Sequence, residues 1–134
     1  MTHSVIDASA LVTYLRGEMG CQVVTAFLAD PDRTCYCHSV NLCEVYYDEC
    51  RVSNTTRAKQ VVDDLLDVGL IERPDMSRPF WQSVGDLKSR GRISLADCFG
   101  LALARELGGD LVTADHHEFD PIVPLGVAPI TFIR

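Results

Sequence analysis

The stretch Ile93–Phe119, ISLADCFGLALARELGGDLVTADHHEF, joins the strongest predicted helix of the chain to a short apolar strand. Apolar residues recur at helical spacing over Leu95–Leu107, and the pair Gly108-Gly109 marks the end of this helix. The segment Leu111–Thr113 then predicts a buried strand. A helix that leads directly into a strand is typical of the units from which parallel α/β sheets are built.

Strand-like and helix-like segments alternate along the rest of the chain. Further strands are predicted at Ser4–Ile6, Thr34–His38, Gly69–Glu72 and Ala128–Phe132. Further helices are predicted at Ala8–Arg16, Cys21–Ala29, Leu42–Val52, Thr55–Val68 and Pro79–Ser89, with at most one helical turn at His116–Phe119. This order predicts an α/β fold, a three-layer α/β/α sandwich around a parallel sheet of four to five strands. The length of 134 residues predicts one domain over residues 1–134.

The bulk composition excludes several classes of protein. Hydrophobic residues make up 47% of the chain and charged residues 23%, which is globular rather than disordered composition. The formal charge of −7 argues against a broad surface that binds nucleic-acid phosphates. Six cysteines without a C-x-x-C motif predict mostly small buried side chains in a reducing compartment. No signal-peptide pattern or membrane-length apolar run is present, so we expect a soluble, cytoplasmic protein that does not associate with membranes.

Four acidic residues border the predicted elements at points that a parallel sheet brings to one edge. They are Asp7, Glu44, Asp97 and Asp115. Carboxylates about 4 Å apart, at an effective dielectric of about 20, repel by on the order of 4 kcal/mol per pair. A hard divalent cation relieves this repulsion, because carboxylate oxygens are preferred ligands of Mg²⁺ and Mn²⁺. The pattern therefore predicts a metal site.

Each acid also has a structural explanation. Ser94-x-x-Asp97 and Asn41-x-x-Glu44 resemble capping boxes, and Asp7 and Asp115 stand where each would cap the helical segment that follows. Uncharged Ser, Thr and Asn cap helices about as well, however, and no Lys or Arg adjoins any of the four acids. The conjunction of four acids at one edge therefore favours a metal site over four separate caps.

Small polar residues accompany these acids. Ser9, Asn41 and Thr113 are expected to orient a carboxylate or a water molecule through hydrogen bonds, or to make ordinary turn and cap hydrogen bonds. The densest basic cluster, Lys88, Arg90 and Arg92, precedes Asp97 closely. It is either a clamp for phosphate groups or a solvated loop.

On these residues the chain resembles a known family. The segments SVIDASALVTYL, SVNLCEVYY, GRISLADCFGLALARELGGDLVTAD and HHEFDPI look like the PIN-domain ribonucleases, and more narrowly the VapC-type toxins of bacterial toxin–antitoxin pairs. The resemblance covers nearly the whole chain and is weakest in the middle third. It implies an α/β/α sandwich and a Mg²⁺- or Mn²⁺-dependent endoribonuclease whose acids are Asp7, Glu44, Asp97 and Asp115.

The resemblance also implies partners and leaves some residues aside. It implies a VapB-type antitoxin whose C-terminal segment lies in the active-site groove, an RNA substrate and a homodimer. The segments Cys21–Ala29 and Leu42–Val68 are the expected dimer and antitoxin contacts. Asp120 stands where some members carry an additional acid. His116 and His117 belong to no core pattern of the family, and we interpret them as exposed loop histidines rather than metal ligands.

Three other classes of protein share some of these features. A haloacid-dehalogenase-like phosphoryl-aspartate enzyme needs a second Asp where Ser9 stands, and a receiver domain needs a Lys that is absent near Val112–Asp120. A metal-dependent adhesion motif fails because its fifth position is Leu11. A PIN-like module that only binds RNA or protein, without turnover, remains an alternative to an enzyme.

Overall fold

A five-stranded parallel sheet forms the centre of the protein. The computed structural model describes all 134 residues. The strands are β1 (Thr2–Ile6), β2 (Arg33–His38), β3 (Ile71–Arg73), β4 (Asp110–Thr113) and β5 (Ile130–Phe132). Their order across the sheet is β3-β2-β1-β4-β5, and every neighbouring pair is parallel. The predicted parallel sheet is therefore confirmed, with β1 at its centre.

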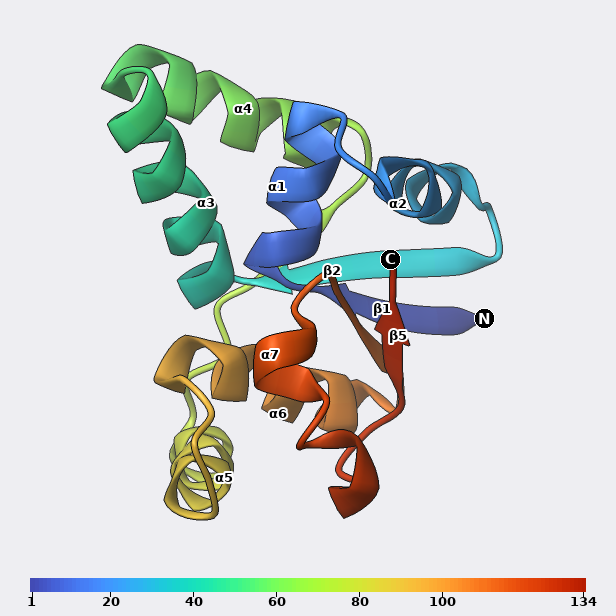
Figure 1. The fold of residues 1–134 in the computed structure, drawn as a ribbon, viewed down its shortest axis with the longest axis vertical. Helices are drawn as coiled ribbons and strands as arrows, with labels where there is room; N and C mark the ends of the chain where they lie inside the picture. The colour runs from blue at the N-terminus through green and yellow to red at the C-terminus, as the bar shows by residue number, and fades with distance from the viewer.

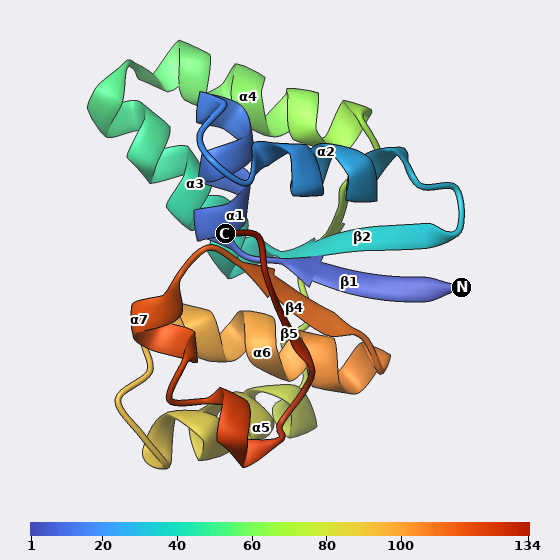
Figure 2. The same cartoon turned by 45° about the vertical axis from the view of Figure 1, so that its right-hand side comes forward.

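Helices cover both faces of this sheet and complete the predicted three layers (Figures 1 and 2). On one face lie α1 (Ala8–Arg16), α2 (Cys21–Ala29), α3 (Ser39–Val52) and α4 (Thr55–Asp67), and on the other lie α5 (Arg78–Ser89), α6 (Leu95–Leu107) and the single turn α7 (His116–Phe119). A short 3₁₀ helix at Val123–Leu125 leads into β5. None of the helices combines the length and apolar character that a membrane crossing requires.

Two apolar cores, one on each face of the sheet, hold the layers together. Successive strand residues point to opposite faces, so Val5 packs in the core beneath α5 and α6, whereas Ile6 packs in the core beneath α1 to α4. Cys35 and Cys37 are both buried in the second core, as their alternate spacing predicted. The broader expectation for the cysteines holds for only half of them, because Cys21 and Cys50 are partly exposed and Cys43 is exposed.

The start of α3 differs from the prediction. The helix begins at Ser39 rather than Leu42, and its N-cap is His38, whose Nδ1 accepts a hydrogen bond from the Val40 amide at 3.0 Å. The reading of Asn41 as the residue that opens this helix is therefore wrong. A buried histidine ring supplies the cap acceptor that Ser, Thr, Asp or Asn usually provides, so the helix gains an extra turn before Leu42.

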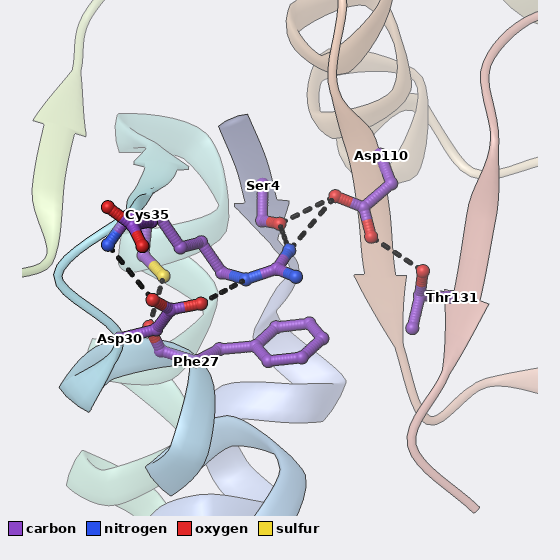
Figure 3. A network of polar contacts seen from close by, with 8 residues as sticks. Ser4, Phe27, Asp30, Cys35, Asp110 and Thr131 are labelled. Atoms are coloured by element: carbon purple, nitrogen blue, oxygen red, sulfur yellow. Dashed lines mark hydrogen bonds and ion pairs between the residues drawn. The ribbon is translucent and has the colours of Figure 1, made fainter. Parts of the chain in front are cut away.

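At the amino ends of the strands, a polar network ties β1, β2, β4 and β5 together (Figure 3). Asp110 accepts hydrogen bonds from the hydroxyls of Ser4, at 2.6 Å, and Thr131. The Arg33 guanidinium stacks 3.8 Å from the Phe27 ring centre, donates to Ser4 and lies 3.9 Å from Asp110. Asp110 is thus a carboxylate whose charge is matched by a cation, at the end of the sheet opposite the predicted site.

Candidate active site

The four predicted acids lie together where the carboxyl ends of the central strands meet helix amino termini. Asp7 follows β1 and caps α1, and Asp115 lies two residues after β4 and caps α7. Asp97 lies in the first turn of α6, and Glu44 projects from the second turn of α3. Because β1 and β4 are neighbours, and α3 packs against α6, segments far apart in the sequence share this edge.

Asp7 is the most buried of the four acids, with only 2% of its surface exposed. One oxygen accepts from the Ala10 amide at 2.9 Å and the Ser9 hydroxyl at 2.7 Å, so its predicted capping role is confirmed. Burial raises the pKa of Asp7 to about 6, and the nearby charge of Asp115 adds to this effect. Hydrogen bonds from Thr113, Ala10 and Ser9 lower that pKa only in part. No cation compensates the carboxylate.

The pKa of Asp97 is affected by several of the neighbouring acids. Its pKa is raised to about 7, chiefly by burial and to a smaller extent by the negative charges of Asp7, Glu44 and Glu118. A hydrogen bond from Ser94 acts in the opposite direction. Repulsion among the acids therefore contributes to the raised pKa values of Asp97 and Asp7, although burial is the larger cause for both.

Asn41 holds Glu44 in place and connects α3 to α6. Its side chain is fully buried and donates to Glu44 Oε1 at 3.0 Å and to the Ala96 carbonyl at 3.1 Å. Partial burial raises the pKa of Glu44, and the Asn41 hydrogen bond opposes that shift. Gly100 allows this close packing, because a Cβ there would lie 3.0 Å from Asn41 Oδ1. Asn41 is thus an orienting residue inside the helix rather than a cap.

Ser9 and Thr113 connect Asp7 to the Asp115 loop. The Ser9 hydroxyl donates to Asp7, accepts from the Ala114 amide at 3.0 Å and lies 3.1 Å from Thr113 Oγ1. Thr113 Oγ1 in turn accepts from the Asp115 amide at 3.0 Å. The two hydroxyls therefore fix the backbone on both sides of the acid cluster, and Ser9 in addition holds the Asp7 carboxylate.

A fifth acid, Glu118, joins the cluster and was missed from the sequence. Its amide donates to Asp115 Oδ1 at 3.0 Å, and its carboxylate accepts from the Ser94 amide at 3.3 Å. The Ser94 hydroxyl does cap α6 by accepting from the Asp97 amide, but the reciprocal bond to the Ser94 amide comes from Glu118 rather than from Asp97. The Asp115-x-x-Glu118 spacing, which is that of a capping pair, was the available signal.

The residues around α7 that were left outside the site have other contacts. His116 Nδ1 lies 2.8 Å from Asp120 Oδ1, its Nε2 lies 2.7 Å from the Arg134 carbonyl oxygen, and its ring stacks 3.9 Å from that of Phe132. The hydrogen bond to Arg134, together with Asp120, raises the pKa of His116. Both ring nitrogens of His116 are engaged, and Asp120 contacts His116 rather than the acids. His117 is exposed on the same turn.

One residue of the basic cluster, Arg92, lies close to Glu118. Lys88 is in the last turn of α5, and Arg90 and Arg92 follow that helix as exposed residues. Arg92 lines a cleft of about 360 Å³ together with His117 and Glu118. None of the three basic residues forms an ion pair with a site acid.

The donor set fits a hard divalent cation bound partly through water. None of the five acids has a Lys, Arg or His partner within ion-pair distance, in contrast to Asp110 at the opposite end of the sheet. No three Asp, Glu, His or Cys side chains converge at metal-ligand spacing, so there is no closed protein cage. Mg²⁺ does not require such a cage, because it usually keeps several waters and binds through one or two carboxylates plus substrate phosphates.

Comparisons with known proteins give a family match over most of the chain. The family model of the PIN domain matches residues 4–122. No curated protein sequence matches the chain significantly.

Solved structures share the fold at low sequence identity. The chain is similar to VapBC2 from Rickettsia felis bound to a promoter DNA fragment, with a TM-score of 0.77, 15% identity and 98% of each chain covered. It is similar to DNA-bound VapBC from Salmonella typhimurium, with a TM-score of 0.73, 17% identity and 100% of each chain covered. It is also similar to Mycobacterium tuberculosis VapC20, a toxin that cleaves the sarcin–ricin loop, with a TM-score of 0.69, 13% identity, and 88% of this chain and 94% of that one covered.

Proposed function

The chain belongs to the PIN domain family, and on that basis we propose that it is a metal-dependent endoribonuclease and the toxin of a VapBC-type toxin–antitoxin pair. PIN domains of the VapC type are nucleases, which makes a hydrolase the broad class. The proposed metal ligands and catalytic residues are Asp7, Glu44, Asp97 and Asp115. Ser9, Asn41 and Thr113 orient them.

One observation carries this proposal, which is the uncompensated negative charge of the acid cluster. Asp7 and Asp97 have pKa values raised to about 6 and about 7, and neither has a cationic partner. A fold that serves only as a binding scaffold has no reason to keep such destabilised carboxylates together, whereas a cation site requires them. Mg²⁺, or Mn²⁺, is the cation that oxygen ligands of this kind select.

The chain's own residues then define the reaction. When bound, the cation activates a water molecule and neutralises charge on the RNA phosphate. Asp7 is held rigidly by the Ser9 hydroxyl and the Ala10 amide, and Glu44 by Asn41, so the carboxylates meet the substrate without reorganisation. The water oxygen bonds to phosphorus as the bond to the 3′-oxygen breaks. The products are a 5′-phosphate and a 3′-hydroxyl.

RNA must approach this site although the whole chain is acidic. Lys88, Arg90 and Arg92 provide exposed positive charge beside Glu118, and we assign them to backbone phosphates near the acids. Replacing all three by Ala should weaken RNA binding and flatten its dependence on salt concentration, because fewer counterions are released. An unchanged salt slope would contradict the assignment.

A protein partner has a suitable surface between α3 and α4. The largest cleft, about 460 Å³, lies between α3 and α4 and contains Leu42, Tyr46 and Val62. Val52 and Val68, at the ends of these two helices, are 61% and 47% exposed. Apolar surface of this kind marks interaction sites, and we assign it to a VapB-type antitoxin and to a second copy of the chain in a homodimer. The VapBC complexes among the similar structures support a VapB-type partner.

The deciding experiment is an RNA cleavage assay with purified protein. Total RNA is incubated with Mg²⁺, with Mn²⁺ or with chelator, and the new ends are mapped. We expect cleavage at defined sites with either metal and none with chelator, and 3′-hydroxyl ends at the cleavage sites. Asp7→Asn should abolish cleavage while the protein stays folded. Equal cleavage with chelator, or full activity of Asp7→Asn, would refute the proposal. Binding of RNA without any cleavage would leave a binding module.

A further inference from the structure

A second cleft, of about 290 Å³, opens beside the acid cluster between α1 and α3. Ser9 and Glu44 form its inner wall, so the cleft is continuous with the proposed site. On α3 its lining residues are Glu44, Tyr47, Asp48 and Arg51, which share one face of the helix at three- and four-residue spacing. Nothing in the proposed mechanism uses the outer part of this cleft.

An aromatic ring and two guanidinium groups occupy the outer part. Tyr47 is 44% exposed, although it is a large apolar side chain beside a charged site. The Arg51 guanidinium lies 5.2 Å from the Tyr47 ring centre, and Arg134 lines the same cleft. An exposed aromatic ring flanked by arginines is the combination with which proteins bind unpaired nucleotides, because the base stacks and the arginines meet phosphate.

The position of Arg134 is fixed by the α7 turn. Its carbonyl oxygen lies 2.7 Å from His116 Nε2, and the neighbouring Phe132 ring stacks on His116. The Arg134 guanidinium donates to the Met19 carbonyl at 3.3 Å. His116 matches no core pattern of the family, and this contact gives it a role, because it holds Arg134 beside the cleft.

The charges around the cleft are nearly balanced, although the whole chain carries a formal charge of −7. Asp48 pairs with Arg16 at 2.6 Å and with Arg51 at 3.5 Å, and Glu18 lies 4.0 Å from Arg134. Two guanidinium groups and three carboxylates, those of Glu18, Glu44 and Asp48, line the cleft, and Arg16 adds a third guanidinium group through Asp48, so the charges balance. A phosphate bound here would lie beside Glu44, which lines the same cleft.

We propose that this cleft is a nucleotide subsite for single-stranded RNA, in which one unpaired base stacks on Tyr47 and Arg51 and Arg134 contact the adjoining phosphates. The inference rests on the proposed function, since it places that nucleotide next to the phosphate to be cleaved. Duplex RNA does not fit the same description, because its bases are already stacked and paired and cannot offer a free face to Tyr47.

The test is a binding titration that needs no catalysis. A fluorescently labelled single-stranded RNA 12-mer and a duplex of the same length are titrated with protein in Ca²⁺ and again in chelator, by fluorescence anisotropy. We expect Tyr47→Ala to weaken single-strand binding by about tenfold, the effect of losing one stacked base. Tyr47→Phe should bind as the wild type does. Duplex affinity should be the same for all three proteins.

The arginines are tested by the salt dependence of the same binding. Arg51→Ala and Arg134→Ala should each lower the slope of log affinity against log salt by about 0.7, the value for one phosphate of a single strand. Arg105→Ala is the matched control, because Arg105 is an exposed arginine in the last turn of α6, away from the helix end that carries Asp97. It should leave the slope unchanged.

The outcomes separate this inference from the proposed function. Cleavage by the wild type in Mg²⁺ with unaltered RNA affinity in Tyr47→Ala would overturn the subsite alone and leave the cleft to a protein partner. Equal losses in Tyr47→Ala and Tyr47→Phe would also overturn the subsite, because stacking would not be the cause. The expected binding pattern without cleavage by the wild type would support the subsite and refute the nuclease. Absence of any RNA binding would refute both.

Discussion

Replacing Asp7 by Asn should stabilise the metal-free protein. Burial raises the pKa of this carboxyl from 3.8 to about 6, and the side chain is 2% exposed. At about 1.4 kcal/mol per pKa unit, keeping the carboxylate ionised at pH 8 costs the folded state about 3 kcal/mol. Asn keeps the cap on the Ala10 amide but offers a poorer acceptor to the Ser9 hydroxyl, at a cost of about 1 kcal/mol. We therefore expect a net gain of about 2 kcal/mol.

The pH dependence of the free energy of unfolding tests the same effect independently. The folded protein binds the Asp7 proton more tightly than the unfolded chain does. The stabilisation that this proton provides is therefore complete below pH 4 and is lost as the pH rises through about 6. From Asp7 alone, wild-type stability in chelator should fall by about 1.4 kcal/mol between pH 5 and pH 8. The raised pKa values of Asp97 and His116 act in the same direction.

The assay is urea unfolding followed by circular dichroism, in chelator, at pH 5 and pH 8. The matched control is Asp86→Asn, an exposed acid on α5 whose side chain has no hydrogen bond, which should change stability by less than about 0.5 kcal/mol. Addition of Mg²⁺ at pH 8 should stabilise the wild type and not Asp7→Asn. If Asp7→Asn were less stable than the wild type at pH 8 in chelator, or if wild-type stability did not fall between pH 5 and pH 8, the electrostatic account of the cluster would be wrong.

Three further predictions concern metal affinity, an orienting hydroxyl and a tight turn. Because protons compete with the cation for the acids, Mg²⁺ affinity measured by calorimetry should rise between pH 6 and pH 8, by up to about tenfold per pH unit for each proton displaced; a flat profile would contradict this. Thr113→Val should cost about 1–3 kcal/mol in urea unfolding, since it leaves the Asp115 amide without its acceptor; an unchanged midpoint would show that water replaces the hydroxyl. Gly109→Ala should destabilise by at least about 2 kcal/mol because its Cβ would lie 2.1 Å from the His3 carbonyl oxygen, whereas Gly108→Ala, at φ +66° with open space around it, should cost only about 1 kcal/mol. Equal effects of the two alanines in urea unfolding would rule out the steric explanation.

Much of the fold could be predicted because its signals are local. Apolar spacing over Leu95–Leu107, the glycine pair after it and the short apolar segments between helices are sufficient to predict an α/β sandwich. Element ends were less predictable, because they depend on partners elsewhere in the chain. The start of α3 shows this, since His38 takes up the cap role only because its ring is buried between Phe80 and Phe99.

For the candidate site, too, some residues could be predicted from the sequence and others could not. The four acids could be placed at one edge from the sequence, because every parallel strand delivers its carboxyl end there. Glu118 could not, because its relevance depends on its carboxylate reaching the Ser94 amide from a different loop. Nor could Asp110 be recognised as structural, since its cation, Arg33, is 77 residues away in the sequence and adjacent only in the folded sheet.

The sequence by itself therefore determined the layers, the parallel sheet and the edge at which four carboxylates meet, because periodicity and strand direction are properties of short segments. Only the tertiary structure decided which carboxylates are compensated and which are not, since that depends on long-range partners and on burial. It also decided that α1, α3 and Arg134 enclose a cleft beside Glu44. A cleft is made by the packing of elements, and no single segment encodes it.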